Sequence, residues 1–541
     1  MSTIYLVEPG PTGGPGVMGA LILIDALRRD GHRVVHVRMR DGDAEGQAVM
    51  VASGSIDVVD ASLLPRPDAW FVSCLYVRQW VHLVDLLERA GVPLLAADRD
   101  DRHPLVAFGG AVSITPEPMA PFADVLALGD GEVTGVALAR WAAHGRAVAM
   151  REARGRPGYY VPLLDAPPTS FSRVEAPLVP VAVEPGERGS PTIELARGCK
   201  SKCAFCPIGW SGGSYREATP EQIRPLLDRH RGRPVNLFAP DYSSVSWSLD
   251  ADAAMDAASC TPRGRDARMD ATDRALIRGA AVREYSFGVE GLSERLRRAI
   301  GKPLDTERIV RTMAALSNVG TIKWYLIFAL PGEADADRAE FRALLAEVRR
   351  VYAGRLDLTL THFQSVPHTP LQWASNHFDD DAYAWVMDLR AWLADADRAN
   401  GSDGRGRWMC SQPKGRETHE HDAWLQRGDR SLAGYLLDRR RGAVASGRWR
   451  EGAARHGAPD VARTLDAIPP DVVTPWSHVD VGQPIERVRR GWDAYQRAML
   501  APTREAVSVS GLAPGIERAP RPDVAPTLSA WQPSLLAPRR R

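Results

Sequence analysis

Two stretches of this sequence alternate strand-like apolar runs with amphipathic, helix-like runs, and this alternation limits the possible fold more than any other feature. In residues 1–145, strand-like runs such as TIYLVE, RVVHVRM and LVAFGG alternate with helix-like runs such as ALILIDALRRDGH and VTGVALARWAAHG. Alternation of this kind is typical of a parallel sheet covered by helices on both faces. We therefore expect an α/β fold that begins with a Rossmann-like, doubly wound parallel sheet. Ligands of such sheets bind at the carboxyl ends of the strands.

The second alternating stretch covers residues 189–375 and contains six strand-like runs. They read TIELARG, VNLFAPD, DARMD, EYSFGVE, IKWYLIFALPG and DLTLTHFQSVP. Six β/α units are too few for a closed eightfold barrel. We expect a partial (β/α)6 barrel.

The remaining segments connect or follow these two units. Residues 146–188 are rich in proline and predict an extended linker. Residues 376–500 are mainly helical in pattern, which predicts a helical C-terminal domain. The tail at 501–541 is again Pro-rich, and we expect it to be disordered.

Composition excludes several classes of protein. No apolar run approaches the ~18 residues of a membrane span. The N-terminus lacks the pattern of a signal peptide, and six cysteines in 541 residues do not make a disulfide scaffold. A cytoplasmic protein is expected. From residue 401 onward, 22 arginines and one lysine face 16 acidic residues, which indicates a solvated helical surface or a docking face for an anionic substrate.

Three of the six cysteines lie within eight residues, as C-x3-C-x2-C in RGCKSKCAFCPIGW. Cys199, Cys203 and Cys206 follow the first strand of the second stretch, where barrel active sites form. A structural zinc site needs a fourth, distant ligand. Three buried cysteines that bind nothing are improbable on one short, Lys-rich loop. The pattern favours a [4Fe–4S] cluster held by three thiolates, with one iron open to a small ligand.

This loop resembles that of the radical S-adenosylmethionine (radical SAM) superfamily, including the aromatic Phe205 before the last cysteine. The resemblance covers about residues 190–375. ARMD resembles the third barrel strand and EYSFGVEGLSERLRRAIGK the fourth, which implies that Phe205, Arg268, Ser286 and Glu290 contact the cofactor. LIFALPGE resembles the fifth, with Ala329 where glycine is usual, a small change expected to tighten the backbone slightly.

In this superfamily the open iron binds the amino and carboxylate groups of SAM. Electron transfer then cleaves the sulfonium and yields a 5'-deoxyadenosyl radical. Such a radical requires a dry, shaped barrel mouth. The resemblance also implies an electron donor such as flavodoxin or ferredoxin.

The N-terminal stretch allows two interpretations. Gly14, Gly16 and Gly19 fit G-x-G-x-x-G, but the acidic residue of a dinucleotide site is missing at the expected offset. AFGGAVSITPEPMAPFADVLALGDGE resembles instead the end of the cobalamin-binding domain that precedes many radical SAM barrels. This implies that Gly109, Gly110 and Gly131 approach cobalamin, at positions where a β-carbon of residues 109 and 110 would collide with it. In the closing turn, Asp130 replaces the first glutamate of G-E-G-E.

No D-x-H-x-x-G motif is present, so no histidine is placed to ligate cobalt from below. The loop SCLYVRQW follows the third strand and offers Tyr76 and Arg78 to cover this lower face. The alternatives are ordinary loop packing, or a domain that kept the fold and lost the ligand.

The order of the domains resembles the cobalamin-type class of radical SAM enzymes. This implies methyl transfer from cobalamin to an unactivated carbon. The rivals are a non-methylating rearrangement or cyclisation, possibly on a nucleotide or nucleic acid, and a non-catalytic, cobalamin- or redox-responsive binding protein. A methylthiotransferase is excluded because the N-terminal domain has only Cys74. We expect a small-molecule, peptide or nucleotide substrate and assign no catalytic residue.

Segments of the C-terminal region resemble a group of cobalamin-type proteins. They suggest that His362, His368, Arg427 and Asp429 face the substrate or else cap the barrel. Cys410 is a lone thiol, expected to be a buried, inert cysteine, with a hydrogen-atom or proton donor as the alternative.

Overall fold

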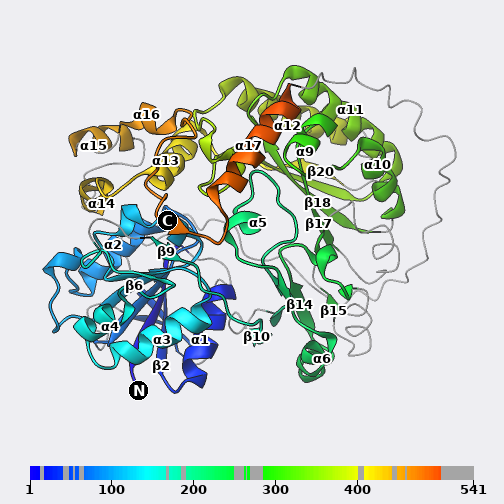
Figure 1. The fold of residues 1–541 in the computed structure, drawn as a ribbon. Coiled ribbons are helices and arrows are strands. Elements are labelled where there is room, and N and C mark those ends of the chain that lie inside the picture. Colours follow the sequence, from blue (N-terminus) through cyan, green and yellow to red (C-terminus); the bar gives the residue numbers. More distant parts are fainter. Residues whose placement is uncertain are drawn as a thin grey trace, which may run out of the picture.

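Figure 1 shows the fold of the protein in a computed structural model. The predicted tail at 501–541, Arg268, Gly14 and Gly16 lie outside the described residues. The structure describes residues 1–11, 18–39, 48–52, 55–59, 66–165, 170–183, 190–248, 261–262, 265–267, 284–317, 319–399, 407–440, 448–456 and 460–500.

The N-terminal sheet has eight strands in the order β4-β3-β2-β1-β5-β6-β7-β8. The five central strands β2, β1, β5, β6 and β7 run parallel to one another. Strands β3, β4 and β8 are antiparallel to their neighbours. The parallel strands are those that the sequence predicts, and the other three are not predicted. The strands are β1 (Thr3–Pro11), β2 (Arg33–Met39), β3 (Ala48–Ala52), β4 (Ser55–Val59), β5 (Ala69–Ser73), β6 (Leu105–Gly109), β7 (Val125–Ala127) and β8 (Tyr159–Tyr160).

Different helices cover the two faces of this sheet, and alternate residues of β1 show the division. Ile4 and Leu6 pack in the core beneath α1, α3 and α4, whereas Tyr5 and Val7 pack toward α2 and the C-terminal helices α13, α14 and α15. Figure 1 shows α13 and α14 above α2. The helices are α1 (Met18–Arg29), α2 (Gln79–Arg89), α3 (Gly131–Ala142), α4 (Arg146–Ala153), α13 (Arg416–Arg427), α14 (Leu432–Arg440) and α15 (Trp449–Arg455).

The segment predicted as a linker contains regular structure. Helix α4 opens it and packs into the core of the N-terminal sheet. Strand β9 (Phe171–Ser172) pairs with β21 (Val479–Asp480), and β10 (Ala182–Val183) pairs with β11 (Thr192–Glu194).

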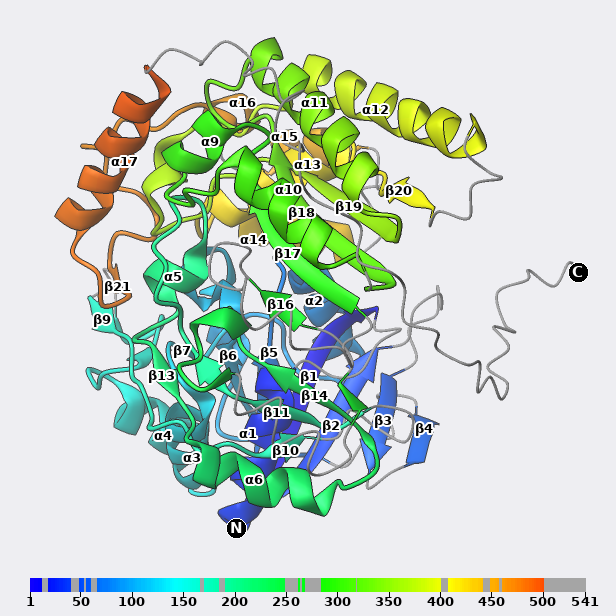
Figure 2. The same cartoon turned by 90° about the vertical axis from the view of Figure 1, so that its right-hand side faces the viewer.

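The second alternating stretch forms two larger sheets. One has the order β10-β11-β14-β15, and the other has five parallel strands in the order β16-β17-β18-β19-β20. Each of the six predicted segments contains strand residues, and β20 is an addition that the sequence pattern does not predict. The strands are β14 (Pro234–Phe238), β15 (Thr261–Pro262), β16 (Arg265–Ala267), β17 (Glu284–Glu290), β18 (Thr321–Phe328), β19 (Arg355–His362) and β20 (Trp408–Cys410). Figure 2 shows β17, β18, β19 and β20 above the N-terminal sheet.

Helices cover one face of the five-stranded sheet. Along β18, Trp324 and Phe328 are buried with Phe341 of α11, whereas Lys323 is partly exposed and Tyr325 is 38% exposed on the opposite face. This alternation has the period of two that a strand requires. The remaining α-helices are α5 (Pro207–Ser211), α6 (Pro220–Arg229), α9 (Glu294–Ala299), α10 (Thr306–Ala315), α11 (Asp335–Val351), α12 (Asp380–Ala399), α16 (Val461–Leu465) and α17 (Ile485–Met499).

The expectation of a mixed α/β fold with parallel sheets and many helices is confirmed. None of the helices in the described ranges is long and apolar enough to cross a membrane.

Candidate functional site

The cysteine loop is the turn of a small antiparallel hairpin between β12 (Ala196–Arg197) and β13 (Arg216–Glu217). Gly198 opens the loop with φ of 74°, and a β-carbon there would lie 2.5 Å from the backbone oxygen of Ser214. Only glycine fits this combination of positive φ and close approach without strain. The hairpin therefore fixes the point at which the cysteine loop leaves β12.

Hydrogen bonds to neighbouring elements hold the loop itself. The backbone N–H of Ala204 donates to Ile300 at 2.8 Å, and Leu371 N–H donates to Ala204 at 3.1 Å. The indole of Trp210 donates to the carbonyl of Cys203 at 3.0 Å. The cysteine loop is thus anchored to the end of α9, to the segment that follows β19 and to α5.

The thiols differ in burial. Cys203 is 7% exposed, whereas Cys199 and Cys206 are partly exposed. Burial raises the pKa of Cys206, and the charges of Cys199 and Glu290 add to this effect. Phe205 packs against the core between the five-stranded sheet and its helices. Among the described residues, no group of three His, Cys, Asp or Glu side chains has the arrangement expected around a single metal ion.

Glu290 ends β17 in an unusual conformation. Its φ is 66°, the pairing of β17 with β18 shifts between Gly288 and Glu290, and its carboxylate lies 3.4 Å from Lys302 Nζ. A non-glycine residue in this region is costly and marks functional sites. Burial raises the pKa of Glu290, and Lys302 opposes this rise. Ser286 is buried on the same strand.

Gly288 makes room for this ion pair. A β-carbon at position 288 would lie 2.4 Å from Glu290 Oε1 and 2.6 Å from Lys302 Nζ. Ala329 has φ of 59°, a left-handed backbone conformation that favours glycine.

A cavity of about 300 Å³ lies at the carboxyl edge of the N-terminal sheet. The ends of β5, β6 and β7 and the first turns of α1 and α3 line it, together with Glu194 and Arg197 of the second stretch. Gly109, Gly110 and Gly131 all contribute to its wall. The place is the edge where ligands of such sheets bind.

In the structure, glycine is required at position 110 for a reason other than the expected contact with a ligand. Its φ is 96°, and a β-carbon would lie 2.4 Å from the backbone oxygen of Cys74, so the protein's own backbone excludes a side chain. Gly109 is unstrained, and its β-carbon would meet only Ala127 O at 3.9 Å. Gly131 faces the side chain of Leu23 at 3.4 Å.

The loop after β5 contributes Leu75 to the cavity wall, whereas Tyr76 and Arg78 are not among the lining residues. Tyr76 is 64% exposed, and Arg78 forms an ion pair with Asp422 of α13 at 2.8 Å. Sequence reasoning identified this loop, in which Cys74 and Leu75 line the cavity.

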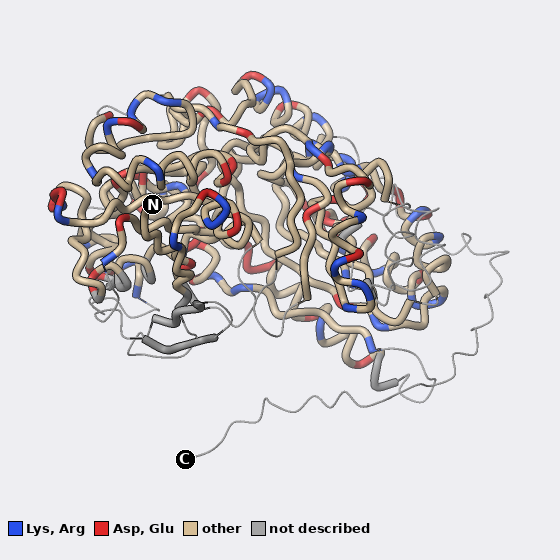
Figure 3. The backbone as a smooth tube through the Cα atoms, turned by 90° about the horizontal axis from the view of Figure 1, so that it is seen from below, with Lys and Arg blue, Asp and Glu red and all other residues tan. Residues whose placement is uncertain are grey.

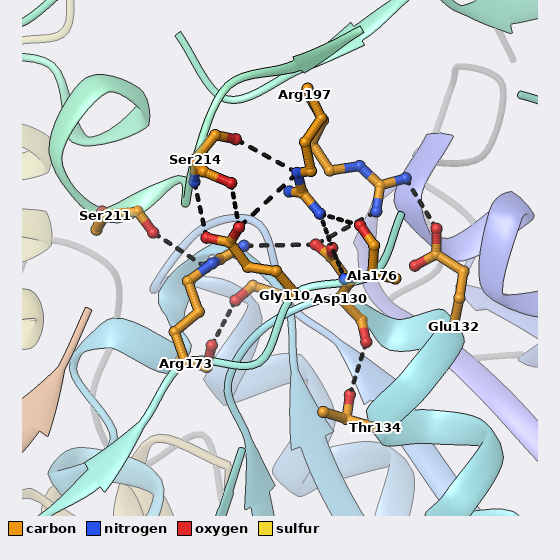
Figure 4. Close-up of polar contacts among 12 residues, drawn as sticks. Gly110, Asp130, Glu132, Thr134, Arg173, Ala176, Arg197, Ser211 and Ser214 are labelled. Atoms are coloured by element: carbon orange, nitrogen blue, oxygen red, sulfur yellow. Dashed lines mark hydrogen bonds and ion pairs between the residues drawn. The ribbon is translucent and has the colours of Figure 1, made fainter. Parts of the chain in front are cut away.

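Sequence reasoning also missed a set of arginines that joins the cavity to the cysteine loop. Arg173, Arg197 and Arg216 all approach the carboxylate of Asp130, in the turn between β7 and α3 (Figure 4). Arg197 also donates to Glu132. The only signal in the sequence was the aspartate in the closing turn, since arginines distant in sequence show no pattern.

The C-terminal candidates form structural contacts. His362 Nδ1 donates to Phe363 O at 2.9 Å, and its Nε2 accepts from the N–H of Asp379. His368 Nε2 donates to Ile114 O at 2.9 Å, which connects the barrel to the N-terminal part.

Arg427 is 4% exposed and donates to carbonyls that include Thr464 and Gln372, while Asp429 accepts from Ser431 N–H beside the start of α14. Cys410 is partly buried at the end of β20, and burial raises the pKa of its thiol to about 12.

Several arginines of the C-terminal region are used in ion pairs within the chain. Arg416 pairs with Asp380, Arg430 with Glu117, and Arg450 with Glu420. Figure 3 shows basic and acidic residues interspersed along the described backbone.

Two family models match the chain. Residues 193–345 match the radical SAM superfamily, and residues 57–162 match the model described as radical SAM proteins, N-terminal. No curated protein matches the chain.

Solved structures show a distant likeness. The cobalamin-dependent S-adenosylmethionine radical enzyme OxsB, with aqua-cobalamin and S-adenosylmethionine bound, is 13% identical, with a TM-score of 0.44, over 92% of this chain and 80% of that one. SuiB of Streptococcus suis, bound to S-adenosylmethionine, is 12% identical, with a TM-score of 0.28, over 41% of this chain and 50% of that one. Residues 193–345 therefore form a part of the chain that matches the radical SAM superfamily, a family that implies a [4Fe–4S] cluster and SAM.

Proposed function

We propose that this protein is a cobalamin-dependent radical SAM methyltransferase that acts on an unactivated carbon. One observation carries the proposal. The cavity in the N-terminal part is bounded by Glu194 and Arg197, and Arg197 lies two residues before Cys199. A ligand in this cavity therefore sits beside the strand that carries the cysteine loop.

The cysteine loop suits an iron–sulfur cluster by the chemistry of its donors. Cys199, Cys203 and Cys206 supply three thiolate ligands, and thiolates suit iron–sulfur clusters. The backbone bonds of Ala204 and the indole bond of Trp210 hold the loop without using the sulfur atoms. When bound, the cluster supplies the electron that cleaves SAM.

Residues near the loop suit SAM. The carboxylate of Glu290 is close enough to influence Cys206, and its ion pair with Lys302 holds it in place. A carboxylate at this point is suited to accept hydrogen bonds from the amino group of SAM. Phe205 and Ser286 complete the proposed contacts, as the resemblance implies, and Arg268 remains a prediction.

The N-terminal cavity suits one part of a corrinoid. Its lining is mainly apolar or glycine, it lies at the ligand edge of a parallel sheet, and its volume of about 300 Å³ falls at the lower end of ligand pockets. Gly109 leaves room for close approach of a ligand, and Gly131 also lines the cavity. Cys74 and Leu75 of the loop after β5 line the cavity and would contact this ligand.

The exposed face of the five-stranded sheet suits the substrate. Lys323 and Tyr325 lie on the side of β18 opposite the helices, with Lys323 Nζ 4.8 Å from the centre of the Tyr325 ring. We propose that a small molecule, peptide or nucleotide binds there, and that an electron donor such as flavodoxin or ferredoxin supplies the reducing equivalent.

The test is the corrinoid, iron and sulfide content of protein purified without oxygen from cells supplied with cobalamin. About one corrinoid per chain is expected, together with iron that is lost in Cys203→Ala. Cys410→Ala is the matched control and is expected to retain the iron. Protein with iron but no corrinoid would refute the methyl-transfer function, and equal iron in both variants would refute the assignment of the cysteine loop.

A further inference from the structure

A single carboxylate of the N-terminal part holds both ends of the cysteine loop. Arg197 and Arg216 are directly paired residues of the β12–β13 hairpin, so they mark the two points where the loop leaves and returns. Arg197 Nη1 lies 3.2 Å from Asp130 Oδ1, and Arg216 Nη1 donates to Asp130 Oδ2. Both ends of the loop are thereby tied to one side chain on another sheet.

A third arginine ties the middle of the loop to the same group. Arg173 Nη2 lies 3.6 Å from Asp130 Oδ1, and Arg173 Nη1 donates to the carbonyl of Ser211 in α5 at 3.0 Å (Figure 4). The N–H of Ala176 adds a hydrogen bond to Asp130 at 2.8 Å. Asp130 thus contacts the start of the loop, its helix and its end, directly or through one arginine.

This arrangement is buried and depends on charge. Asp130 is 4% exposed. Burial raises the pKa of Asp130, but the hydrogen bonds from Arg216 and Ala176 and the charge of Arg197 outweigh it and leave the pKa lowered. Removing one partner from a buried charge network leaves the others uncompensated, so the loop depends strongly on this carboxylate.

The same residues face the N-terminal cavity. Asp130, Glu132 and Arg197 all line it, and Arg197 Nη2 lies 2.8 Å from Glu132 Oε1. A ligand in the cavity therefore meets the side chains that position the cysteine loop.

We propose that Asp130 is the positioning residue that sets the cysteine loop relative to the N-terminal cavity, and that occupancy of the cavity and binding of SAM at the loop are coupled through it. The coupling rests on the proposed function, whereas the positioning role does not. Coupling between two binding sites is reciprocal, so a corrinoid in the cavity changes the affinity for SAM by the same factor as SAM changes the affinity for the corrinoid.

The positioning role is tested by hydrogen exchange in the cofactor-free chain. Asp130→Asn keeps the shape of the side chain and removes its charge. Asp124→Asn is the matched control, because Asp124 is also buried, pairs with Arg99 and Arg146 and accepts from Val106 N–H at 2.8 Å, all within the N-terminal part.

We expect amide exchange in residues 198–216 to become about tenfold faster in Asp130→Asn and to stay unchanged in Asp124→Asn. If Asp130→Asn does not fold, Arg173→Met removes the bond to Ser211 together with the ion pair between Arg173 and Asp130, and faster exchange in residues 207–212 is expected. The proposal is overturned if a folded Asp130→Asn protein exchanges the loop amides at the wild-type rate. It is also overturned if the rate rises equally in Asp124→Asn.

The coupling is tested by the dissociation constant of SAM for reconstituted protein, with and without hydroxocobalamin. The second readout is the change in the spectrum of the reduced cluster when SAM is added. A variant that only lowers the stability of the protein leaves this change as it is in wild type. We expect at least a fivefold effect of the corrinoid in wild type and none in Asp130→Asn. Equal effects in both proteins overturn the coupling, whereas a wild type that binds no corrinoid refutes the proposed cofactor and leaves the exchange experiment to decide the positioning role.

Discussion

Gly109 and Gly110 are adjacent and both line the cavity, yet the structure predicts opposite results for the two alanine variants. Gly110 has φ of 96° and ψ of −170°, and its β-carbon would lie 2.4 Å from Cys74 O. Gly109 is a strand residue whose β-carbon would meet its nearest neighbour, Ala127 O, at 3.9 Å. The pair therefore separates a backbone role from a ligand role.

The difference in stability follows from the two conformations. The region occupied by Gly110 is open almost only to glycine, and a side chain there costs of order 1–3 kcal/mol before the collision with Cys74 is counted. Gly109→Ala is expected to gain about 0.5–1 kcal/mol, because alanine loses less backbone entropy on folding than glycine. The two variants should therefore differ by about 3 kcal/mol, which is roughly a hundredfold in an equilibrium constant.

Hydrogen exchange of the backbone amides in β5 and β6 measures this difference directly. The N–H of Cys74 donates to Gly109 O at 3.1 Å and is a suitable probe. We expect its protection to fall by about a hundredfold in Gly110→Ala and not at all in Gly109→Ala, within the limit set by global unfolding. Corrinoid content should nevertheless fall in Gly109→Ala, because its methyl group takes up space in the cavity wall. Equal protection in the two variants would show that the collision with Cys74 is not what selects glycine.

Two further predictions concern the barrel. In Gly288→Ala the new β-carbon must displace the ion pair of Glu290 and Lys302, so we expect the dissociation constant for SAM to rise about tenfold; unchanged affinity, measured by equilibrium dialysis, would contradict this role of the ion pair. Burial lowers the pKa of His368 from 6.5 to about 4. Between these two pH values the unfolded chain binds a proton that the folded chain does not. The free energy of unfolding therefore falls by up to about 3 kcal/mol as the pH drops from 6.5 to 4. Asn tolerates the positive φ of this residue, so His368→Asn should retain the fold, although without the hydrogen bond to Ile114, and should show a smaller loss of stability between pH 7.5 and 4.5 in urea titrations. If the stability of His368→Asn depends on pH as in wild type, the proton taken up on unfolding binds to a group other than His368.

Local patterns were sufficient for the main elements of both sheets. The run TIKWYLIF alternates buried and exposed residues along β18, as its composition predicts, because a strand that packs on one face needs only a period of two. The run WMC at β20 is too short to carry such a pattern. It is a strand because Leu356 and Leu358 of β19 provide its hydrogen-bonding edge, which is a property of the folded sheet.

The sequence by itself determined the main parallel strands and the helices between them, the position of the three cysteines after a predicted strand, and the glycines at the ends of β6 and β7. These follow from residue spacing and from conformations that few residues adopt. Only the tertiary structure decided that Asp130 meets Arg173, Arg197 and Arg216, and that α13 to α15 cover the second face of the N-terminal sheet. Both the contacts of Asp130 and the position of these helices depend on which distant segments pack together and exclude water. Local sequence patterns do not contain this information, because it arises only when the chain folds.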